Sequence, residues 1–404
     1  MAREMKDSGV KWIGTIPTSW NIQKVKTAFY RSKEEAHIED PVILSLARSG
    51  VKIRDISNNE GQLAESYYNY NPVVEGDLLL NPMDLYSGAN CSISKVSGVI
   101  SPAYINLRTR GNCCPAFYDY YFKTQYWAMA LFAHGKGVSF DNRWTLSPND
   151  LFNYYIPVPD VDEQKRIADF LDRKCAEIDT VIEKTKATIE EYKKLKQSVI
   201  TEAVTKGVRG DRPMKDSGVD WIGKFPAEWT FAELKMFCKV NNGKEIANEV
   251  DKETEGAISV YGSGGVFKYT DNYMFDGKTV MFGRKGTLGK PLYVTGKVWV
   301  VDTMYYLTYS PNLIPKFNYY QLWAFDWVPH ITQTALPSIV ASQIVACKFA
   351  IPSLQEQQEI IDFLDRKCAE IDKLIADKTH LLEEMEIYKK SVIFEYVTGK
   401  KEIV

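Results

Sequence analysis

A glycine-rich turn that carries several cations is the segment of this chain best suited to bind an anion. Its centre reads Gly283-Arg284-Lys285-Gly286-Thr287-Leu288-Gly289, and the surrounding segment 277–297 contains no Asp or Glu. Backbone amides and cationic side chains in such a turn can approach phosphates closely. An ordinary solvated hairpin is the structural alternative. The candidate DNA-contacting residues of this region are Lys268, Arg284, Lys285, Thr287 and Lys290.

The N-terminal half of the chain has polar residues of the same kinds in two scattered stretches. Arg and Asn side chains can each pair bidentately with a base edge in the major groove of DNA. Each of these residues could equally be a solvated surface residue. The candidates are Arg48, Lys52, Arg54, Lys136, Asn142 and Arg143.

The motifs that catalysis requires are incomplete. Gly277-Lys278-Thr279 could end a phosphate-binding loop, but Asn272 stands where the loop needs a glycine. Asp160 and Glu163 could bind a metal in a nuclease, yet they lie where a helix cap is expected. Only four His are present, none at ligand spacing from a Cys. The sequence therefore favours a binding protein over an enzyme.

The chain repeats itself, which sets its organisation. Residues 5–14 return at 214–223 with one change, Lys11 to Asp220, and the decapeptide at 170–179 returns unchanged at 363–372. Each half of about 200 residues thus combines a variable region with a nearly constant one.

The constant stretches predict two long helices. Apolar residues alternate at spacings of three and four over 163–205 and 356–398, without Pro or Gly. Each helix would be on the order of 60 Å long, and alone it would expose its apolar seam. We therefore expect the two helices to pair antiparallel about a pseudo-twofold axis. The predicted coiled-coil and subunit-docking residues are Leu171, Ile178, Ile182, Ile189, Tyr192, Leu364, Ile371, Ile375, Leu382 and Met385.

Both helices have the start signals of a capping box. The signals are Asp160-x-x-Glu163 and Ser353-x-x-Glu356, in which the Glu side chain is expected to reach back to the cap. Gly207 and Gly399 are expected to end the helices.

The variable regions predict one domain type, rich in strands. Strands are expected at 73–80, 104–108, 277–282 and 304–308, and helices near 115–132 and 315–327. The fold class is therefore α+β: two globular domains separated by two long antiparallel coiled-coil helices, with an internal pseudo-twofold repeat. The predicted divisions are a conserved segment 1–19, a first domain 20–157, a helix 158–208, a repeated segment 209–227, a second domain 228–352 and a helix 353–404.

Composition limits the partners. The 404 residues include 50 Lys or Arg and 52 Asp or Glu, so a globally basic nucleic-acid binder is excluded and only a local basic patch remains. The longest apolar run, 127–133, is too short for a bilayer, so no membrane partner is expected. Seven Cys without a CxxC pair indicate reduced thiols in a cytoplasmic protein.

Taken together, these segments resemble the specificity (S) subunit of type I restriction-modification systems. The resemblance rests on the duplicated Lys-Asp-Ser-Gly-Val-x-Trp-Ile-Gly and on the Ile-Pro…Glu-Gln…Phe-Leu-Asp-Arg-Lys segments at 156–173 and 351–367. The long helices and the basic turn extend it over essentially the whole chain. One departure is that Leu80-Asn81-Pro82-Met83-Asp84 stands where the second region has its basic turn, so the turn is not duplicated.

The resemblance implies that each variable region is a target recognition domain reading one half of a bipartite, asymmetric site in double-stranded DNA. It implies that the helices set the spacer and dock two methyltransferase (modification) subunits, which methylate adenine with S-adenosylmethionine. Two motor-nuclease (restriction) subunits can then join, and ATP and Mg²⁺ are expected in the partner subunits. The chain itself would have no catalytic residues, cofactor or metal. The alternative is a coiled-coil scaffold that binds proteins and does not recognise DNA.

Overall fold

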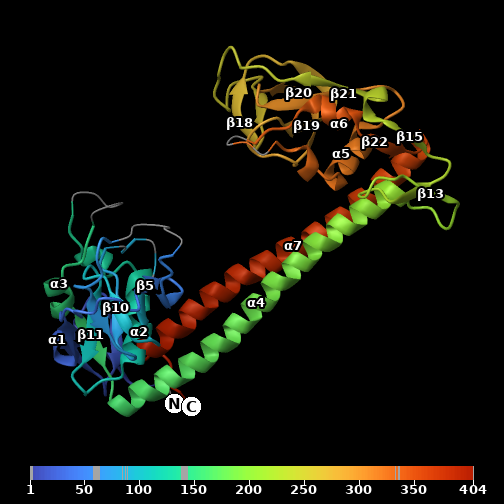
Figure 1. The fold of residues 1–404 in the computed structure, drawn as a ribbon. Helices are drawn as coiled ribbons and strands as arrows, with labels where there is room; N and C mark the ends of the chain where they lie inside the picture. The colour runs from blue at the N-terminus through green and yellow to red at the C-terminus, as the bar shows by residue number, and fades with distance from the viewer. Residues whose placement is uncertain are drawn as a thin grey trace. The chain divides into compact units, whose positions relative to one another are not determined.

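The chain folds into two compact units. The computed structural model describes residues 3–57, 64–83, 85–86, 88, 90–137, 144–332, 334 and 337–403. The first unit comprises Met1–Lys184 with Leu381–Val404, and the second comprises Thr185–His380. Each unit is an α+β domain built on a portion of two long helices (Figure 1). In the described part of the chain, no helix is long and apolar enough to cross a membrane.

The first unit is built around a four-stranded antiparallel sheet. Its order is β4 (Phe29–Ser32), β11 (Ile105–Thr109), β8 (Leu78–Leu80) and β9 (Cys91–Ile93). Four strand pairs surround it: β1 (Met5–Asp7) with β2 (Thr15–Pro17), β3 (Asn21–Lys24) with β12 (Tyr155–Val158), β5 (Leu44–Ala47) with β6 (Gly50–Ile53), and β7 (Asn71–Val73) with β10 (Gly98–Ile100). Its helices are α1 (Val25–Ala28), α2 (Pro115–Trp127) and α3 (Pro148–Asn153). The strands expected within 73–80 and 104–108 are confirmed, and α2 ends before residue 132 as Met129 takes φ +57°.

The second unit has a larger sheet of six strands. Its order is β16 (Cys238–Asn242), β21 (Met304–Tyr309), β19 (Phe275–Gly283), β20 (Leu292–Val300), β17 (Ile258–Gly262) and β18 (Gly265–Thr270). The unit also has two strand pairs, β13 (Met214–Asp216) with β14 (Lys224–Pro226) and β15 (Thr230–Glu233) with β22 (Lys348–Ile351). Its helices α5 (Pro315–Ala324) and α6 (Ala341–Ala346) pack against strands of the sheet. The strands expected at 277–282 and 304–308 are confirmed within β19 and β21. The basic turn connects β19 to β20.

The two long helices are α4 (Val161–Lys206) and α7 (Leu354–Val397), which pack together within each unit (Figure 1). In the first unit, Leu171 packs in one buried core with Val392 and Ile393. In the second, Ile200 packs with Ile361 and Leu364. Seam residues Ile178, Ile182, Ile189 and Ile371 are also buried, whereas Tyr192, Ile375, Leu382 and Met385 are half-buried. The predicted antiparallel helix pair is therefore confirmed.

Two lysines interrupt the apolar seam and pair with acids of the opposite helix. Lys196 Nζ lies 2.7 Å from Asp372, and Lys389 Nζ lies 2.6 Å from Asp179. The two ion pairs are equivalent under the internal repeat, because each Asp is the last residue of one copy of the duplicated decapeptide. Burial raises the pKa of the Cys175 thiol in this seam, so the thiol packs as a neutral group.

The glutamates of the two capping boxes do not reach back to the cap, contrary to expectation. The carboxylate of Glu163 accepts a 3.0 Å hydrogen bond from Trp20 Nε1 and pairs with Arg3 at 2.6 Å. In the second unit, Glu356 accepts from Trp229 Nε1 at 3.1 Å and pairs with Arg212 at 2.6 Å. An ion pair to a distant arginine replaces the weaker local bond, and it fastens the start of each long helix to the preceding domain.

The glutamine that follows each glutamate fastens the other side of the domain. Gln164 Oε1 accepts from the backbone N–H of Cys114, and Gln357 Oε1 accepts from that of Ile314, both at 2.8 Å. Cys114 and Ile314 are the residues that precede α2 and α5. The duplicated Glu-Gln therefore orients each variable domain on its helix.

Candidate nucleic-acid interface

The basic turn of the second unit is held from three sides. Arg284 donates its backbone N–H to Thr303 O at 2.8 Å and accepts from Ile339 N at 3.0 Å. Thr287 donates its backbone N–H to Ser263 Oγ at 3.2 Å, which ties the turn to the tip of the β17–β18 hairpin. The side chains of Arg284, Lys285 and Lys290 are exposed, and Thr287 is half-buried. A rigid backbone thus presents three cations to solvent.

Gly286 makes this backbone possible. Its φ is +82°, and a Cβ at this position would lie 2.8 Å from Ser263 Oγ. We expect Gly286→Ala to strain the turn by about 1–2 kcal/mol and to weaken DNA binding without removing a charge. Gly264→Ala is the matched control, because a Cβ there meets nothing within 4 Å. Electrophoretic mobility titration of both variants would test this, and equal affinities would show that the turn's shape is irrelevant.

The first unit gathers three of its candidates on one hairpin. Arg48 lies in the turn between β5 and β6, whose closing pair is Ala47 with Gly50. Lys52 is exposed on β6, and Arg54 is half-buried and two residues further on. Residues two apart on an extended chain share a face, so Lys52 and Arg54 face the same way. The structure therefore brings together residues that the sequence showed only as neighbours.

The remaining candidates differ in their surroundings. Lys136 is exposed and lies 3.7 Å from the carboxylate of Asp150, and Lys268 pairs with Glu249 at 2.5 Å. These acids offset part of the charge that each lysine offers to a phosphate. Asn142 and Arg143 lie outside the described residues.

Two exposed aromatic rings, one in each unit, were missed by the sequence analysis. Phe267 on β18 is 56% exposed, and its ring would lie 3.1 Å from a Cβ at Gly262, beside the hairpin tip that holds the basic turn. Tyr86 in the first unit is 70% exposed, with its ring 6.2 Å from that of Phe132. Exposed rings beside cations suit stacking on bases or sugars. In the sequence, both looked like ordinary strand or loop residues.

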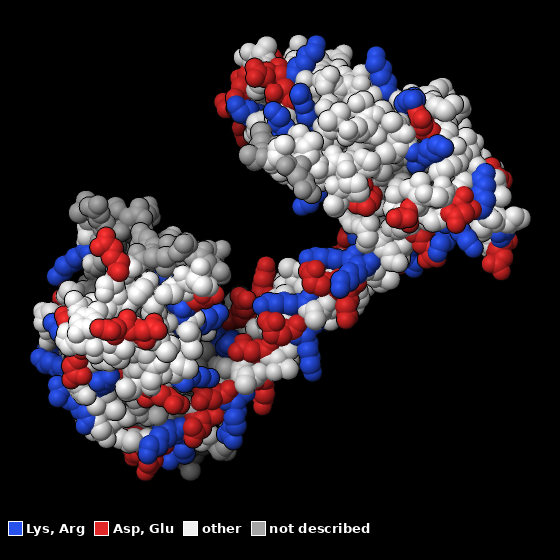
Figure 2. All heavy atoms as spheres, in the orientation of Figure 1, with Lys and Arg blue, Asp and Glu red and all other residues white. Residues whose placement is uncertain are grey.

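Charge is mixed over the visible surface of both units. Figure 2 shows Lys and Arg interspersed with Asp and Glu on each of them. Because the net charge of the protein is −2, a polyanion can bind only at local clusters of cations, such as those of the basic turn and the β5–β6 hairpin.

The sequence is similar to that of several known proteins. Residues 226–384 match the type I restriction modification DNA specificity domain. The putative type I restriction enzyme MjaX specificity subunit of Methanocaldococcus jannaschii is 25% identical over 64% of this chain, and the alignment spans 62% of that relative. The MjaVIII specificity subunit of the same organism is 24% identical over 81% of this chain and 80% of its own.

Solved structures share the fold. A chain from a study of complex assembly and conformational transition in a type I restriction-modification system matches with a TM-score of 0.77 and 14% identity, over 96% of this chain and 99% of that one. The HsdS subunit of Thermoanaerobacter tengcongensis matches with a TM-score of 0.55 and 14% identity, over 98% and 100% of the two chains.

The chain shares its fold, with two domains and a pair of long helices, with these structures, and its second domain matches the DNA specificity domain. The chain is therefore similar to the specificity subunits of type I restriction-modification systems.

Proposed function

We propose that this chain is the non-catalytic recognition subunit of a cytoplasmic restriction-modification complex. Each domain reads one half of a bipartite site in double-stranded DNA. Two methyltransferase subunits, which bind S-adenosylmethionine, dock on the conserved helices, and two motor-nuclease subunits that use ATP and Mg²⁺ join them. The observation that carries the proposal is the duplication of one scaffold beneath two different domains. Such a chain offers two dissimilar readers at once, as an asymmetric split site requires.

The duplicated contacts show which parts the two readers share. Tyr120 donates to Asp172 at 2.7 Å, and Tyr320 donates to Asp365 at 2.6 Å, so both domains meet their helix in the same way. The surfaces beyond these contacts differ: the first unit presents the β5–β6 hairpin, and the second presents the basic turn. The two domains attach to the helices through equivalent contacts but present different surfaces, which supports recognition of two unlike half-sites.

A base-resolution map of adenine methylation in the native host, with and without this gene, tests the proposal. We expect one bipartite motif to lose its methylation when the gene is deleted. An unchanged map in cells that express the complex would contradict the proposal. Reconstitution with the neighbouring methyltransferase subunit, followed by methylation of plasmid DNA, provides the second readout.

We further propose that the helix pair sets the unspecified spacer between the half-sites. Both helices pass through both units, changing from one to the other at Lys184–Thr185 and His380–Leu381. Four residues inserted into each helix, near Thr188 and Leu381, lengthen both by about 6 Å. We expect the methylated motif to gain about two base pairs of spacer.

Insertion of seven residues into each helix is the matched control for the pairing. It preserves the 3-4 seam and adds about 10 Å, so the expected gain is about three base pairs. An unchanged spacer in a variant that still methylates DNA would rule out the ruler role of the helices.

The protein-binding scaffold is the second candidate function, supported by the half-buried seam residues Leu382 and Met385. The salt dependence of DNA affinity distinguishes the two functions. A DNA-recognition subunit assembled with its methyltransferase partners binds DNA more weakly as salt rises, whereas a scaffold shows no salt-dependent DNA binding at all.

A further inference from the structure

The β17–β18 hairpin of the second unit exposes an aromatic ring at an irregularity of its strand pairing. Tyr261 pairs with Val266. The preceding residue, Val260, pairs with Lys268, so Phe267 is the extra residue of a β-bulge. Val266 and Phe267 are consecutive in β18, yet they are 42% and 56% exposed. The bulge therefore presents two neighbouring apolar side chains to solvent.

These two side chains lie on the last strand of the six-stranded sheet. The outer edge of β18 is covered at Tyr269, whose carbonyl accepts from the backbone N–H of Val250 at 3.0 Å. This contact lies two residues beyond Phe267. Folded proteins normally cover an apolar edge or blunt it with charges. Two exposed apolar residues at such an edge therefore indicate a surface that another molecule covers.

Phe267 lies beside the residues that hold the basic turn. Its ring would lie 3.1 Å from a Cβ at Gly262, so the ring packs over the backbone of that glycine. The next residue, Ser263, accepts from the backbone N–H of Thr287 at 3.2 Å, and its Cβ would lie 3.3 Å from a Cβ at Gly283. The hairpin tip and the turn are therefore in direct contact, so the exposed ring and the cations of the turn lie on neighbouring segments.

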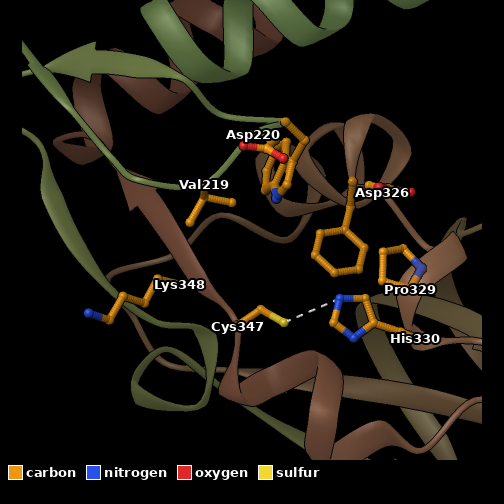
Figure 3. A pocket seen from close by; sticks show the side chains of 9 residues that line it. Val219, Asp220, Asp326, Pro329, His330, Cys347 and Lys348 are labelled. Carbon is orange, nitrogen blue, oxygen red and sulfur yellow. Dashed lines mark hydrogen bonds between the residues drawn. The ribbon is translucent and has the colours of Figure 1, made fainter.

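The aromatic rings at a cavity of the same unit are, in contrast, paired within the protein. This cavity of about 290 Å³ lies between the segments 219–221, 325–330 and 347–348. The ring of Phe325 stacks on that of His330 at 5.1 Å and meets Trp221 edge-on at 5.6 Å. His330 Nε2 also lies 3.7 Å from Cys347 Sγ, and the two side chains point toward each other (Figure 3). Because these rings already have partners, Phe267 is the better candidate for contact with a base.

We propose that Phe267 stacks on a base of the half-site that the second domain reads, while Arg284 and Lys285 contact the phosphates beside it. The inference rests on the proposed recognition of DNA and names a residue that performs it. Phe is one of the residues that DNA-binding proteins insert between neighbouring base pairs, which unstacks them in part. Contacts between nearby cations and phosphates offset the cost of that unstacking.

The charge of the adjoining turn favours DNA over a partner protein as the molecule that covers Phe267. The segment 277–297, which contains the turn, has five cations and no Asp or Glu. A polyanion matches such a segment, whereas an apolar protein surface would leave its cations without counter-charges. The ring and the cations together therefore fit a nucleic acid, which offers flat apolar bases next to phosphates.

DNA binding by the chain assembled with its methyltransferase partners tests the proposal. The probe is a duplex that carries the bipartite motif found by the methylation map. We expect Phe267→Ala to lower the affinity about tenfold or more, because stacking on a base is lost. The slope of log affinity against log salt should equal that of the wild type, because no charge is removed. Phe267→Trp keeps a stacking ring and should retain most of the affinity.

Cross-linking provides a readout that does not depend on affinity. Each pyrimidine of the half-site is replaced in turn by its 5-iodo analogue, and ultraviolet light should link one of these positions to Phe267, as identified by mass spectrometry. Tyr273→Ala is the matched control. Its ring is 46% exposed and lies beyond the other end of β18, with the ammonium of Lys297 4.8 Å from the ring centre. This variant should bind DNA as the wild type does.

Undiminished affinity of Phe267→Ala, in a complex whose wild type binds DNA, would overturn this inference and leave the proposed function intact. Equal losses in Phe267→Ala and Tyr273→Ala would also overturn it, as would the absence of a cross-link to Phe267 at every position. If Phe267→Ala prevents assembly with the methyltransferase subunits, the ring contacts protein and the inference is wrong. Absence of DNA binding by the wild-type complex would contradict the proposed function and this inference with it.

Discussion

Replacement of Arg284 and Lys285 by alanine is expected to weaken DNA binding by the assembled complex on the order of 10–100-fold at 0.1 M salt. Both side chains are exposed on a turn whose backbone is fixed by Thr303, Ile339 and Ser263. Loss of two phosphate contacts also lowers the slope of log affinity against log salt by about 1.8. Titrations at several salt concentrations, with specific and unrelated duplexes, provide the measurement.

The matched control removes the same charge from the opposite end of the same hairpin. Lys278→Ala with Lys297→Ala alters two exposed cations near the Gly277–Gly296 pair of β19 and β20. We expect its affinity and salt slope to stay close to those of the wild type. If the turn variant loses affinity for one base sequence alone, Arg284 and Lys285 read bases and do not contact phosphates.

Glu356→Ala is expected to destabilise the second unit by about 3–5 kcal/mol. Glu356 is 2% exposed and receives both Trp229 Nε1 and the guanidinium of Arg212. Removal of the carboxylate leaves the Trp229 N–H without its acceptor and the largely buried Arg212 with only the exposed Glu228, 3.1 Å away, as a counter-charge, which costs more than the pair itself contributes. Urea denaturation followed by tryptophan fluorescence and by helical circular dichroism measures the change in the free energy of unfolding.

A neighbouring glutamate on the same helix is the control for this prediction. Glu359 pairs with Arg209 at 2.8 Å, but its side chain is 38% exposed. Exposed ion pairs contribute little, so Glu359→Ala should leave the free energy of unfolding close to that of the wild type. Equal losses in the two variants would mean that the buried Arg212–Glu356 pair does not fasten the helix to the domain.

The helices and the duplication could be read from the sequence because their signals are local or repeated. A seam such as Leu171, Ile178 and Ile182 indicates a helix through its spacing alone. Identical decapeptides indicate equal structures wherever they lie. The strands at 277–282 and 304–308 were equally clear, because β-forming residues filled short runs next to glycine.

The candidate site could be predicted only in part, because exposure and ion pairing depend on residues distant in sequence. The sequence does not distinguish Lys268 from Lys285. In the structure, Lys268 pairs with Glu249, whereas Lys285 is exposed on the basic turn. Phe267 is of a residue type that is usually buried, and its exposure follows from its position on β18.

The sequence by itself determined that this protein is a tandem duplication with two paired helices, two unlike domains and no complete catalytic motif. Periodicity and identity carry that information without a partner residue. The tertiary structure determined which contacts the duplicated residues make in each copy. It directed Glu163 and Glu356 each to a tryptophan and an arginine. These contacts join residues that are distant in the sequence, and no local sequence pattern predicts them.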